Sequence, residues 1–304
     1  MTPPARTRIG ITLGDPRGIG PEVVRKALAD ARIRSLPVDW LVIGATGTEQ
    51  PVGDATGHWE PSGEAVADAA QAGALAGRAV QRATALALEG LIDGVVTAPL
   101  DKAALYAGGF DYPGHTEMLA ALAGVPTTMM LASDRLRVVL ATTHIALRDV
   151  PSAVTGEAIA RAGIATRTAL RQDFGIAEPR IALCALNPHG GDGGRFGDED
   201  SRVLAPAARV AGIAGPYPAD TVFVRAMRGE FDAVIAPYHD VGMTAIKVAS
   251  FGEAVNVTLG LPFVRTSPDH GTALDIAGQG IASAESMIAA ILLAVQITAR
   301  RRNV

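Results

Sequence analysis

The sequence is poor in cysteine and in aromatic residues. Its single cysteine, Cys184, excludes an intramolecular disulfide and is typical of a protein from a reducing compartment. Cys184 lies inside an apolar run, so we expect a buried structural thiol and not a nucleophile. Aromatic residues make up only 4% of the 304 residues and hydrophobic residues 48%, so aliphatic side chains must fill the core. A chain of this length can bury a sizeable core, and we expect two lobes.

The chain also lacks a strong excess of charge and a long apolar segment. A net charge of −4 at pH 7 gives no electrostatic basis for binding nucleic acid or an anionic membrane. The N-terminal residues contain no apolar signal core, and the apolar stretch 287–297 is too short to span a bilayer. We therefore expect a cytoplasmic protein without nucleic-acid or membrane partners.

Short β-branched runs alternate with longer Ala-, Leu- and Arg-rich segments, which predicts strands connected by helices. The predicted strands cover residues 8–13, 40–43, 94–97, 128–131, 137–141, 180–186, 232–236 and 255–259. The predicted helices cover residues 21–31, 64–90, 155–173, 201–211, 221–228 and 284–300, and a loop is predicted over 47–63. This order indicates an α/β fold with a mostly parallel sheet covered by helices on both faces. In such sheets, ligands bind at the carboxyl ends of the strands.

Histidine is scarce as well, and its placement is informative. Five of the six histidines follow apolar, strand-like runs: His115, His144, His189, His239 and His270. Imidazole is the commonest protein ligand for transition metals. His144, His189 and His239 are too far apart in sequence for a local zinc-finger pair, but they suit a site assembled from several strand ends. Each could instead cap a helix or pair with a carboxylate; three in equivalent positions favour a metal site with room for a substrate.

Several side chains suit a phosphorylated ligand. The candidates are His115, Thr116, Lys247, Asn256 and Arg265. His115 and Thr116 stand at a predicted helix start, where free backbone N–H groups can bind an oxyanion. Arg265 follows an apolar run, which is unusual for a simple surface charge. A surface position is the alternative for each basic residue taken singly, and Lys102 could either cap a helix or lie in the cleft.

Two glycine-rich segments are candidates for binding a nucleotide. The first, residues 14–22, joins a predicted strand to a helix, but its spacing is not G-x-G-x-x-G, so a tight turn without a ligand is an equal alternative. The second, residues 269–278, precedes the last predicted helix. An aspartate such as Asp275 can accept hydrogen bonds from both ribose hydroxyls and would repel the extra phosphate of NADP, which favours NAD. The alternative is a loop whose aspartate caps a turn.

Taken together, these segments resemble the 4-hydroxythreonine-4-phosphate dehydrogenase family of vitamin B6 synthesis. The most specific pieces are residues 14–22, 113–117, 142–150, 186–191, 238–242 and 255–273. The last of them is also similar to the adenosine-binding segment of isopropylmalate and isocitrate dehydrogenases. The resemblance implies their two-lobed, three-layer α/β/α fold with a cleft between the lobes. Lobe 1, with the cofactor-binding elements, would comprise residues 1–100 and 270–304; lobe 2, with metal, substrate and dimer contacts, would comprise 101–269.

The resemblance also implies roles for individual residues. A divalent metal ion (Zn, Mg or Co) at the interface of a homodimer is assigned to His144, His189 and His239, with Asp220 and Asp240 as catalytic acidic residues nearby. The phosphorylated substrate is assigned to His115, Thr116, Lys247, Asn256 and Arg265. NAD is assigned to Gly14, Asp15, His270, Gly271, Thr272, Ala273 and Asp275.

The implied activity is NAD- and metal-dependent oxidation of 4-phosphohydroxy-L-threonine at C3, followed by decarboxylation to 3-amino-2-oxopropyl phosphate. The chain departs from the family pattern at Val241, where glutamine is usual, at Asp101, where asparagine is common, and at Gly190, where alanine is. These departures border the expected substrate pocket, so D-threonate 4-phosphate, D-erythronate 4-phosphate or a cyclic cis-diol acid are alternative substrates. More distant alternatives are a phosphate acyltransferase, which shares the general fold, and a ligand-binding protein.

Overall fold

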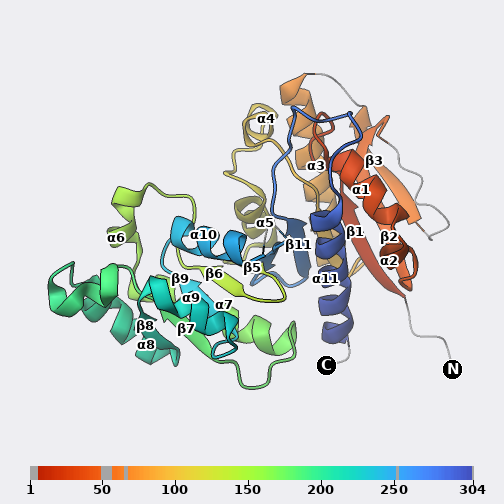
Figure 1. Ribbon diagram of the computed structural model, residues 1–304. Helices are drawn as coiled ribbons and strands as arrows, with labels where there is room; N and C mark the ends of the chain where they lie inside the picture. Colours follow the sequence, from red (N-terminus) through yellow and green to blue (C-terminus); the bar gives the residue numbers. More distant parts are fainter. Residues whose placement is uncertain (1–5, 49–56, 65–67, 251–252, 303–304) are drawn as a thin grey trace. The chain divides into compact units, whose positions relative to one another are not determined.

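The computed structural model describes residues 6–48, 57–64, 68–250 and 253–302 (Figure 1). The chain divides into two compact units. Unit 1 comprises Met1–Thr127 and Leu261–Asn303, and unit 2 comprises Thr128–Gly260. These boundaries differ from the sequence-based ones at 100/101 and 269/270.

Unit 1 is built on a parallel sheet with the strand order β3-β2-β1-β4-β11. Its strands are β1 (Thr7–Thr12), β2 (Val38–Thr46), β3 (Gly57–Glu64), β4 (Gly94–Thr97) and β11 (Val264–Pro268). Its helices are α1 (Gly20–Ala29), α2 (Ala31–Arg34), α3 (Ala69–Leu88), α4 (Lys102–Ala107), α5 (His115–Ala123) and α11 (Glu285–Arg302). Val95 of β4 packs in a core that includes α3, whereas Gly94 lies against Thr298 of α11. Since neighbouring strand residues point to opposite faces, helices cover both sides of this sheet.

Contacts within unit 1 explain why its boundaries differ from the predicted ones. Helices α4 and α5 both pack against α3, which brings residues 101–127 into this unit. Strand β11 pairs in parallel with β4, with Arg265 opposite Val95. Neither contact has a sequence signal, because both depend on packing between segments that are distant along the chain.

Unit 2 has the strand order β10-β5-β6-β9-β7-β8, antiparallel across β10, β5 and β6 and parallel from β6 to β8. Its strands are β5 (Thr128–Ala132), β6 (Arg137–Leu140), β7 (Ile181–Cys184), β8 (Ala214–Tyr217), β9 (Ala233–Ala236) and β10 (Val255–Leu259). Its helical segments are η1 (Leu147–Asp149), α6 (Val150–Ala153), α7 (Gly156–Gln172), η2 (Pro188–Gly194), η3 (Asp200–Leu204), α8 (Ala205–Ala211), α9 (Ala219–Met227) and α10 (His239–Ser250). Residues of α9 and α10 share one core with β6 and β9, and α7 also contacts the sheet.

The mostly parallel α/β fold predicted from the alternating segments is confirmed. The prediction of a loop over 47–63 is wrong for its second half, because β3 begins at Gly57; residues 49–56 lie outside the described residues. Two further strands were missed, β8 with the sequence AGPY and β11 with VRTSP. Glycine, proline and serine weaken the local strand signal, and these strands form because they pair with β7 and β4.

Cys184 is fully buried in the apolar core of unit 2, as predicted. Burial raises the pKa of its thiol to about 12, and the nearby negative charges of Asp200 and Asp220 act in the same direction. The thiol is therefore protonated and unreactive at neutral pH. Among the described helices, none combines the length and the apolar character needed to cross a membrane.

The Gly242→Ala substitution tests how closely α10 packs on the sheet of unit 2. A Cβ atom at this position would lie 2.6 Å from Cδ2 of Leu140 and 2.9 Å from Cβ of Ala236. We expect the free energy of unfolding, measured by urea denaturation, to fall by about 1–3 kcal/mol because the core is overpacked. The exposed Thr244→Ala substitution on the same helix is the control, and an equal change in both variants would contradict this explanation.

Candidate active site

Two of the predicted metal ligands, His144 and His239, lie side by side in unit 2. His144 follows β6 and His239 begins α10 directly after β9, and these two strands pair in parallel. Their carboxyl ends therefore meet at one edge of the sheet. The Oγ1 atom of Thr142 donates a hydrogen bond of 2.7 Å to the carbonyl of Pro237, which ties the two connections together. As a result, the imidazole ring centroids are 5.6 Å apart.

Asp240 fixes the orientation of the His239 ring. Its Oδ1 atom lies 2.7 Å from Nδ1 of His239. A carboxylate oxygen accepts this hydrogen bond from Nδ1, which leaves Nε2 as the ring nitrogen that faces away from Asp240. A carboxylate bound to the second nitrogen is the usual arrangement of a metal-ligating histidine.

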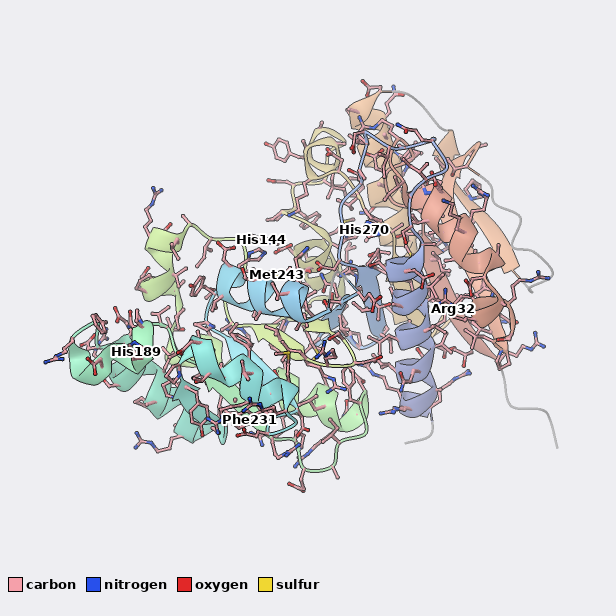
Figure 2. The ribbon with its side chains drawn as sticks, viewed as in Figure 1. Arg32, His144, His189, Phe231, Met243 and His270 are labelled. Carbon is pink, nitrogen blue, oxygen red and sulfur yellow. The ribbon has the colours of Figure 1, made fainter. Side chains whose placement is uncertain are left out.

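The third predicted ligand, His189, lies elsewhere in unit 2. Figure 2 shows its label on η2, well away from that of His144. His189 is exposed and has a left-handed backbone with φ 55°, in a run of six residues of positive φ that ends at Gly194. The buried carboxylate of Asp200 supports this segment by accepting hydrogen bonds of 2.8 and 3.0 Å from the backbone N–H groups of Leu186 and Asn187. Left-handed backbone at a non-glycine residue persists only where the surroundings enforce it, often at functional positions.

These positions decide how far one chain can form a metal site. Within the part of the chain that the structure describes, no three His, Cys, Asp or Glu residues are grouped closely enough to hold a metal ion. His144 and His239 are brought together, while His189 is not beside them. Asp220 is exposed in the first turn of α9. Imidazole nitrogens such as those of the pair are ligands that divalent transition metals prefer, and a metal site at this position stays a prediction.

A buried arginine marks a second candidate site, in unit 1. Arg265 lies in β11 and is only 2% exposed, and its Nη2 donates a hydrogen bond of 2.6 Å to Oγ1 of Thr97. Burial lowers the pKa of Arg265 to about 9, against the opposing effect of Glu117, so the guanidinium is charged at pH 7. A cation kept in the interior requires negatively charged partners. Glu117 supplies one negative charge, and binding of an anionic ligand beside Arg265 stays a prediction.

His115 lies at the N-terminus of α5 beside this arginine. Burial lowers the pKa of His115 well below its ordinary value, and the positive charges of Arg265 and Lys102 lower it further. The ring is thus neutral at pH 7, and its buried Nε2 has no hydrogen-bond partner among the described residues. No described side chain caps α5, so its first N–H groups are also available to an anion.

Unit 1 therefore brings together His115 and Arg265, with Thr116 next along α5. The other two predicted substrate ligands belong to unit 2. Lys247 is exposed in the last turn of α10, and Asn256 is half-buried in β10, with a buried Oδ1 that no described residue hydrogen-bonds. Sequence reasoning missed the contacts of Thr97 and Glu117 with Arg265, because neither residue type is unusual beside a helix or strand end.

The two glycine-rich segments meet in unit 1. The backbone N–H of Ile19 donates a hydrogen bond of 2.9 Å to the carbonyl of Thr272, and a Cβ on Gly18 would lie 2.9 Å from that same oxygen. In the second segment, Nε2 of His270 is buried without a partner among the described residues, and Asp275 is exposed. A buried, unpaired ring nitrogen in a segment that also exposes a carboxylate fits the polar groups of a dinucleotide.

The first glycine-rich segment has a clear structural role. The carboxylate of Asp15 is fully buried and accepts hydrogen bonds from the backbone N–H and the guanidinium of Arg17, the shortest being 2.6 Å. Gly14 has a φ of 70°, and a Cβ there would lie 2.0 Å from the carbonyl oxygen of Pro99. The tight turn that the sequence left as an alternative is therefore present, and contact of Gly14 or Asp15 with a cofactor stays a prediction.

Comparison with known proteins relates this architecture to a family. The family described as pyridoxal phosphate biosynthetic protein PdxA matches residues 27–294. A 4-hydroxythreonine-4-phosphate dehydrogenase of Paracoccus denitrificans is 46% identical over 317 residues, which cover 96% of this chain and 98% of that protein. A D-threonate 4-phosphate dehydrogenase of Salmonella typhimurium strain LT2 is 43% identical over 327 residues, with 95% and 98% covered.

Solved structures agree with this relationship. The crystal structure of a 4-hydroxythreonine-4-phosphate dehydrogenase from Klebsiella pneumoniae has a TM-score of 0.85 and 40% identity, and the match covers 97% of this chain and 100% of that chain. The fold and the polar strand ends thus define an α/β protein of the dehydrogenase-like class. Within that class, the chain belongs to the family of pyridoxal phosphate biosynthetic protein PdxA, and the resemblance seen in the sequence is confirmed.

Proposed function

We propose that the protein is an NAD- and divalent-metal-dependent dehydrogenase of pyridoxal phosphate biosynthesis. It oxidises 4-phosphohydroxy-L-threonine at C3, and decarboxylation then gives 3-amino-2-oxopropyl phosphate. The observation that carries this proposal is the pair of imidazole rings, His144 and His239, held 5.6 Å apart at the ends of adjacent parallel strands. The names of the Paracoccus and Salmonella relatives support the reaction class, since both are dehydrogenases of 4-phosphorylated compounds.

In this proposal, the site around the buried Arg265 and His115 of unit 1 binds the phosphate. Arg265 supplies charge-assisted hydrogen bonds, and His115, Thr116 and the first turn of α5 supply further donors. Lys247 and Asn256, both in unit 2, are the other residues proposed to bind the phosphorylated substrate. Because His115 is neutral, it donates a hydrogen bond without adding a third positive charge beside Arg265 and Lys102.

His144 and His239 hold the metal ion together with His189 of a second copy of the chain. The absence of a three-donor group within the described residues of one chain supports this arrangement. So do the exposed apolar side chains next to the histidines, Ile145 and Leu147 after His144 and Phe196 after η2, which are 41%, 67% and 52% exposed. Apolar side chains gathered near functional residues favour a protein interface.

In this proposal, the acidic residues orient a metal ligand and accept a proton. When bound, the divalent cation supplies Lewis-acid stabilisation of negative charge on a substrate oxygen, and NAD supplies a hydride acceptor. Asp240 orients His239 through the 2.7 Å contact, and either Asp240 or Asp220 accepts the proton of the C3 hydroxyl. Once C3 is a ketone, the neighbouring carboxylate can leave as carbon dioxide, because the carbonyl stabilises the electrons left behind.

A related substrate, D-threonate or D-erythronate 4-phosphate, is the second candidate. Val241 and Met243 pack against the apolar core of unit 2, so the position after Asp240 carries a half-buried apolar side chain. Such a side chain cannot hydrogen-bond a substrate amino group, so a substrate that lacks this group would bind no more weakly at this position. The 43% identity to a D-threonate 4-phosphate dehydrogenase supports the same alternative.

The decisive experiment measures NADH absorbance during turnover with a panel of phosphorylated hydroxy acids and a cyclic cis-diol acid. We expect the largest kcat/KM with 4-phosphohydroxy-L-threonine. A larger value with D-threonate 4-phosphate would select the second candidate. No NADH formation with any member, in protein supplied with zinc, magnesium or cobalt, would contradict dehydrogenase activity.

Replacing Asp275 tests the cofactor assignment. We expect the Asp275→Asn variant to bind NAD about tenfold more weakly and to discriminate less against NADP, because the repulsion of the additional phosphate is lost. Isothermal titration with both dinucleotides measures the two Kd values. The matched control is Asp192→Asn, an exposed aspartate of unit 2. An unchanged ratio of the two Kd values in the Asp275 variant would mean that adenosine binds elsewhere.

A further inference from the structure

The second glycine-rich segment has little regular structure of its own. Residues 269–284, all of which the structure describes, form turns and contain no helix or strand. The hydrogen bonds within the segment are turn contacts, such as the one from the N–H of Ile276 to the carbonyl of Ala273. Positive φ values at Ala273, Gly278 and Gly280 add backbone conformations that few residues adopt readily. If such a segment binds a ligand, contacts with the rest of the protein can hold it in one conformation beforehand. Otherwise, part of the binding free energy is lost in ordering the segment.

Helix α1 provides such contacts through Glu22 and Lys26, which we call the α1 clamp. The Nζ atom of Lys26 lies 2.8 Å from Oε1 of Glu22, 2.8 Å from the carbonyl oxygen of Gly280 and 2.7 Å from that of Ala282. Glu22 in turn accepts hydrogen bonds of 3.3 and 3.0 Å from the N–H groups of Gly280 and Ala282. The clamp thus binds both backbone N–H groups and both carbonyls of these two residues, and Lys26 uses all three of its donors.

The clamp differs from an ordinary surface ion pair. Such pairs contribute little to stability because water competes for both partners. The side chain of Glu22, however, is only 9% exposed and that of Lys26 31%. The other end of the segment is held by the hydrogen bond from Ile19 to Thr272. The first glycine-rich segment and the helix that follows it therefore hold the second segment on both sides of Asp275.

We propose that Glu22 and Lys26 are positioning residues that order the second glycine-rich segment and thereby raise its affinity for NAD, without touching the cofactor. This inference rests on the proposed NAD-dependent function. Glu22, at the end of the first segment (residues 20–22), therefore has a role in supporting the second segment, and this role does not require contact with the cofactor. The physical basis is preorganisation: a segment already held in its bound conformation loses less entropy on binding.

The test compares Lys26→Met, which keeps the aliphatic part of the side chain and removes all three donors, with the wild-type protein. Two measurements are made, hydrogen exchange of residues 271–282 without ligand and the Kd of NAD by isothermal titration. We expect faster exchange in this segment and an NAD Kd about tenfold higher, with kcat at saturating NAD and KM for the phosphorylated substrate unchanged. Lys26→Arg keeps a cation with several donors and should restore most of the affinity, and Glu22→Gln provides a second variant should Lys26→Met fold poorly.

Arg32→Gln is the matched control. Arg32, labelled in Figure 2, makes a two-pronged contact of 2.8 and 2.9 Å with Glu285, at the start of α11 beyond the segment. This variant also loses an ion pair next to α1, but it should leave both the NAD Kd and the exchange of residues 271–282 unchanged. Unchanged exchange in Lys26→Met would overturn the ordering role, and faster exchange with an unchanged Kd would overturn the effect on affinity. If wild-type protein binds no NAD, the proposed function fails, while the exchange rates still decide whether the clamp orders the segment.

Discussion

The His189→Ala variant should lose about 10³-fold in turnover and most of its bound metal. Loss of a metal ligand removes several kcal/mol of transition-state stabilisation, and 1.36 kcal/mol corresponds to a factor of ten in rate. Metal content by inductively coupled plasma mass spectrometry and kcat with the phosphorylated substrate measure the two effects. The control is Asp192→Asn, which lies in the same left-handed run and should keep both. Full activity of His189→Ala in metal-free buffer would contradict the proposed mechanism.

Mixing two inactive variants tests whether the site is shared between subunits. If His189 and the His144–His239 pair of one site come from different chains, dimers of His189→Ala with His239→Ala contain one intact site and one doubly altered site. Random re-association of equal amounts should then restore about one quarter of wild-type activity, since half of the dimers are mixed and each has one of two sites intact. No recovery after mixing, with mixed dimers verified by mass spectrometry, would mean that a single chain supplies all three histidines.

The Arg265→Met variant should raise KM for the phosphorylated substrate about 10- to 100-fold. A hydrogen bond to a charged group contributes about 1.5–3 kcal/mol, and the planar guanidinium can bind two phosphate oxygens at once. Steady-state kinetics with the phosphorylated substrate and with its phosphate-free analogue separate this effect from general damage. Only the phosphorylated substrate should lose affinity.

Two further variants accompany this measurement. Arg265→Lys keeps a positive charge to interact with the negative charge of Glu117. Its KM should lie between those of the wild-type protein and the Arg265→Met variant. Arg225→Met is the control, because this half-buried arginine pairs with Glu230 and stacks on Tyr217, in unit 2. An unchanged KM in Arg265→Met would show that the buried guanidinium serves only the structure of β11.

The sequence was informative about the histidines because strand ends have a local signal. An apolar run followed by Thr142-Thr143-His144 or by Tyr238-His239-Asp240 marks a strand that ends in a polar turn, whatever the rest of the chain does. Parallel pairing of β6 and β9 then brings the two turns together, as expected of residues at equivalent strand ends. The position of His189 could not be predicted, because its six-residue run of positive φ depends on the buried carboxylate of Asp200.

Buried charge was the main feature that the sequence did not reveal fully. Arg265 stood out only because it follows an apolar run, and its surroundings come from two other segments, Thr97 from β4 and His115 and Glu117 from α5. The departure at Asp101 has a local explanation: its carboxylate accepts a hydrogen bond of 2.7 Å from the N–H of Ala104 and caps α4, as an asparagine would. The departure at Val241 is partly a matter of packing, since the side chain contacts the core of unit 2.

By itself, the sequence determined the α/β class, most of the strands and helices, the buried thiol and the family, because periodicity and short polar motifs are local properties. Tertiary structure alone decided which strands are neighbours, how residues divide between the two units, and that the first glycine-rich segment supports the second. The physical reason is that these features depend on hydrogen bonds and burial between groups more than 80 residues apart, as for Lys26 with Gly280 and Arg265 with Thr97. No local pattern encodes such pairings.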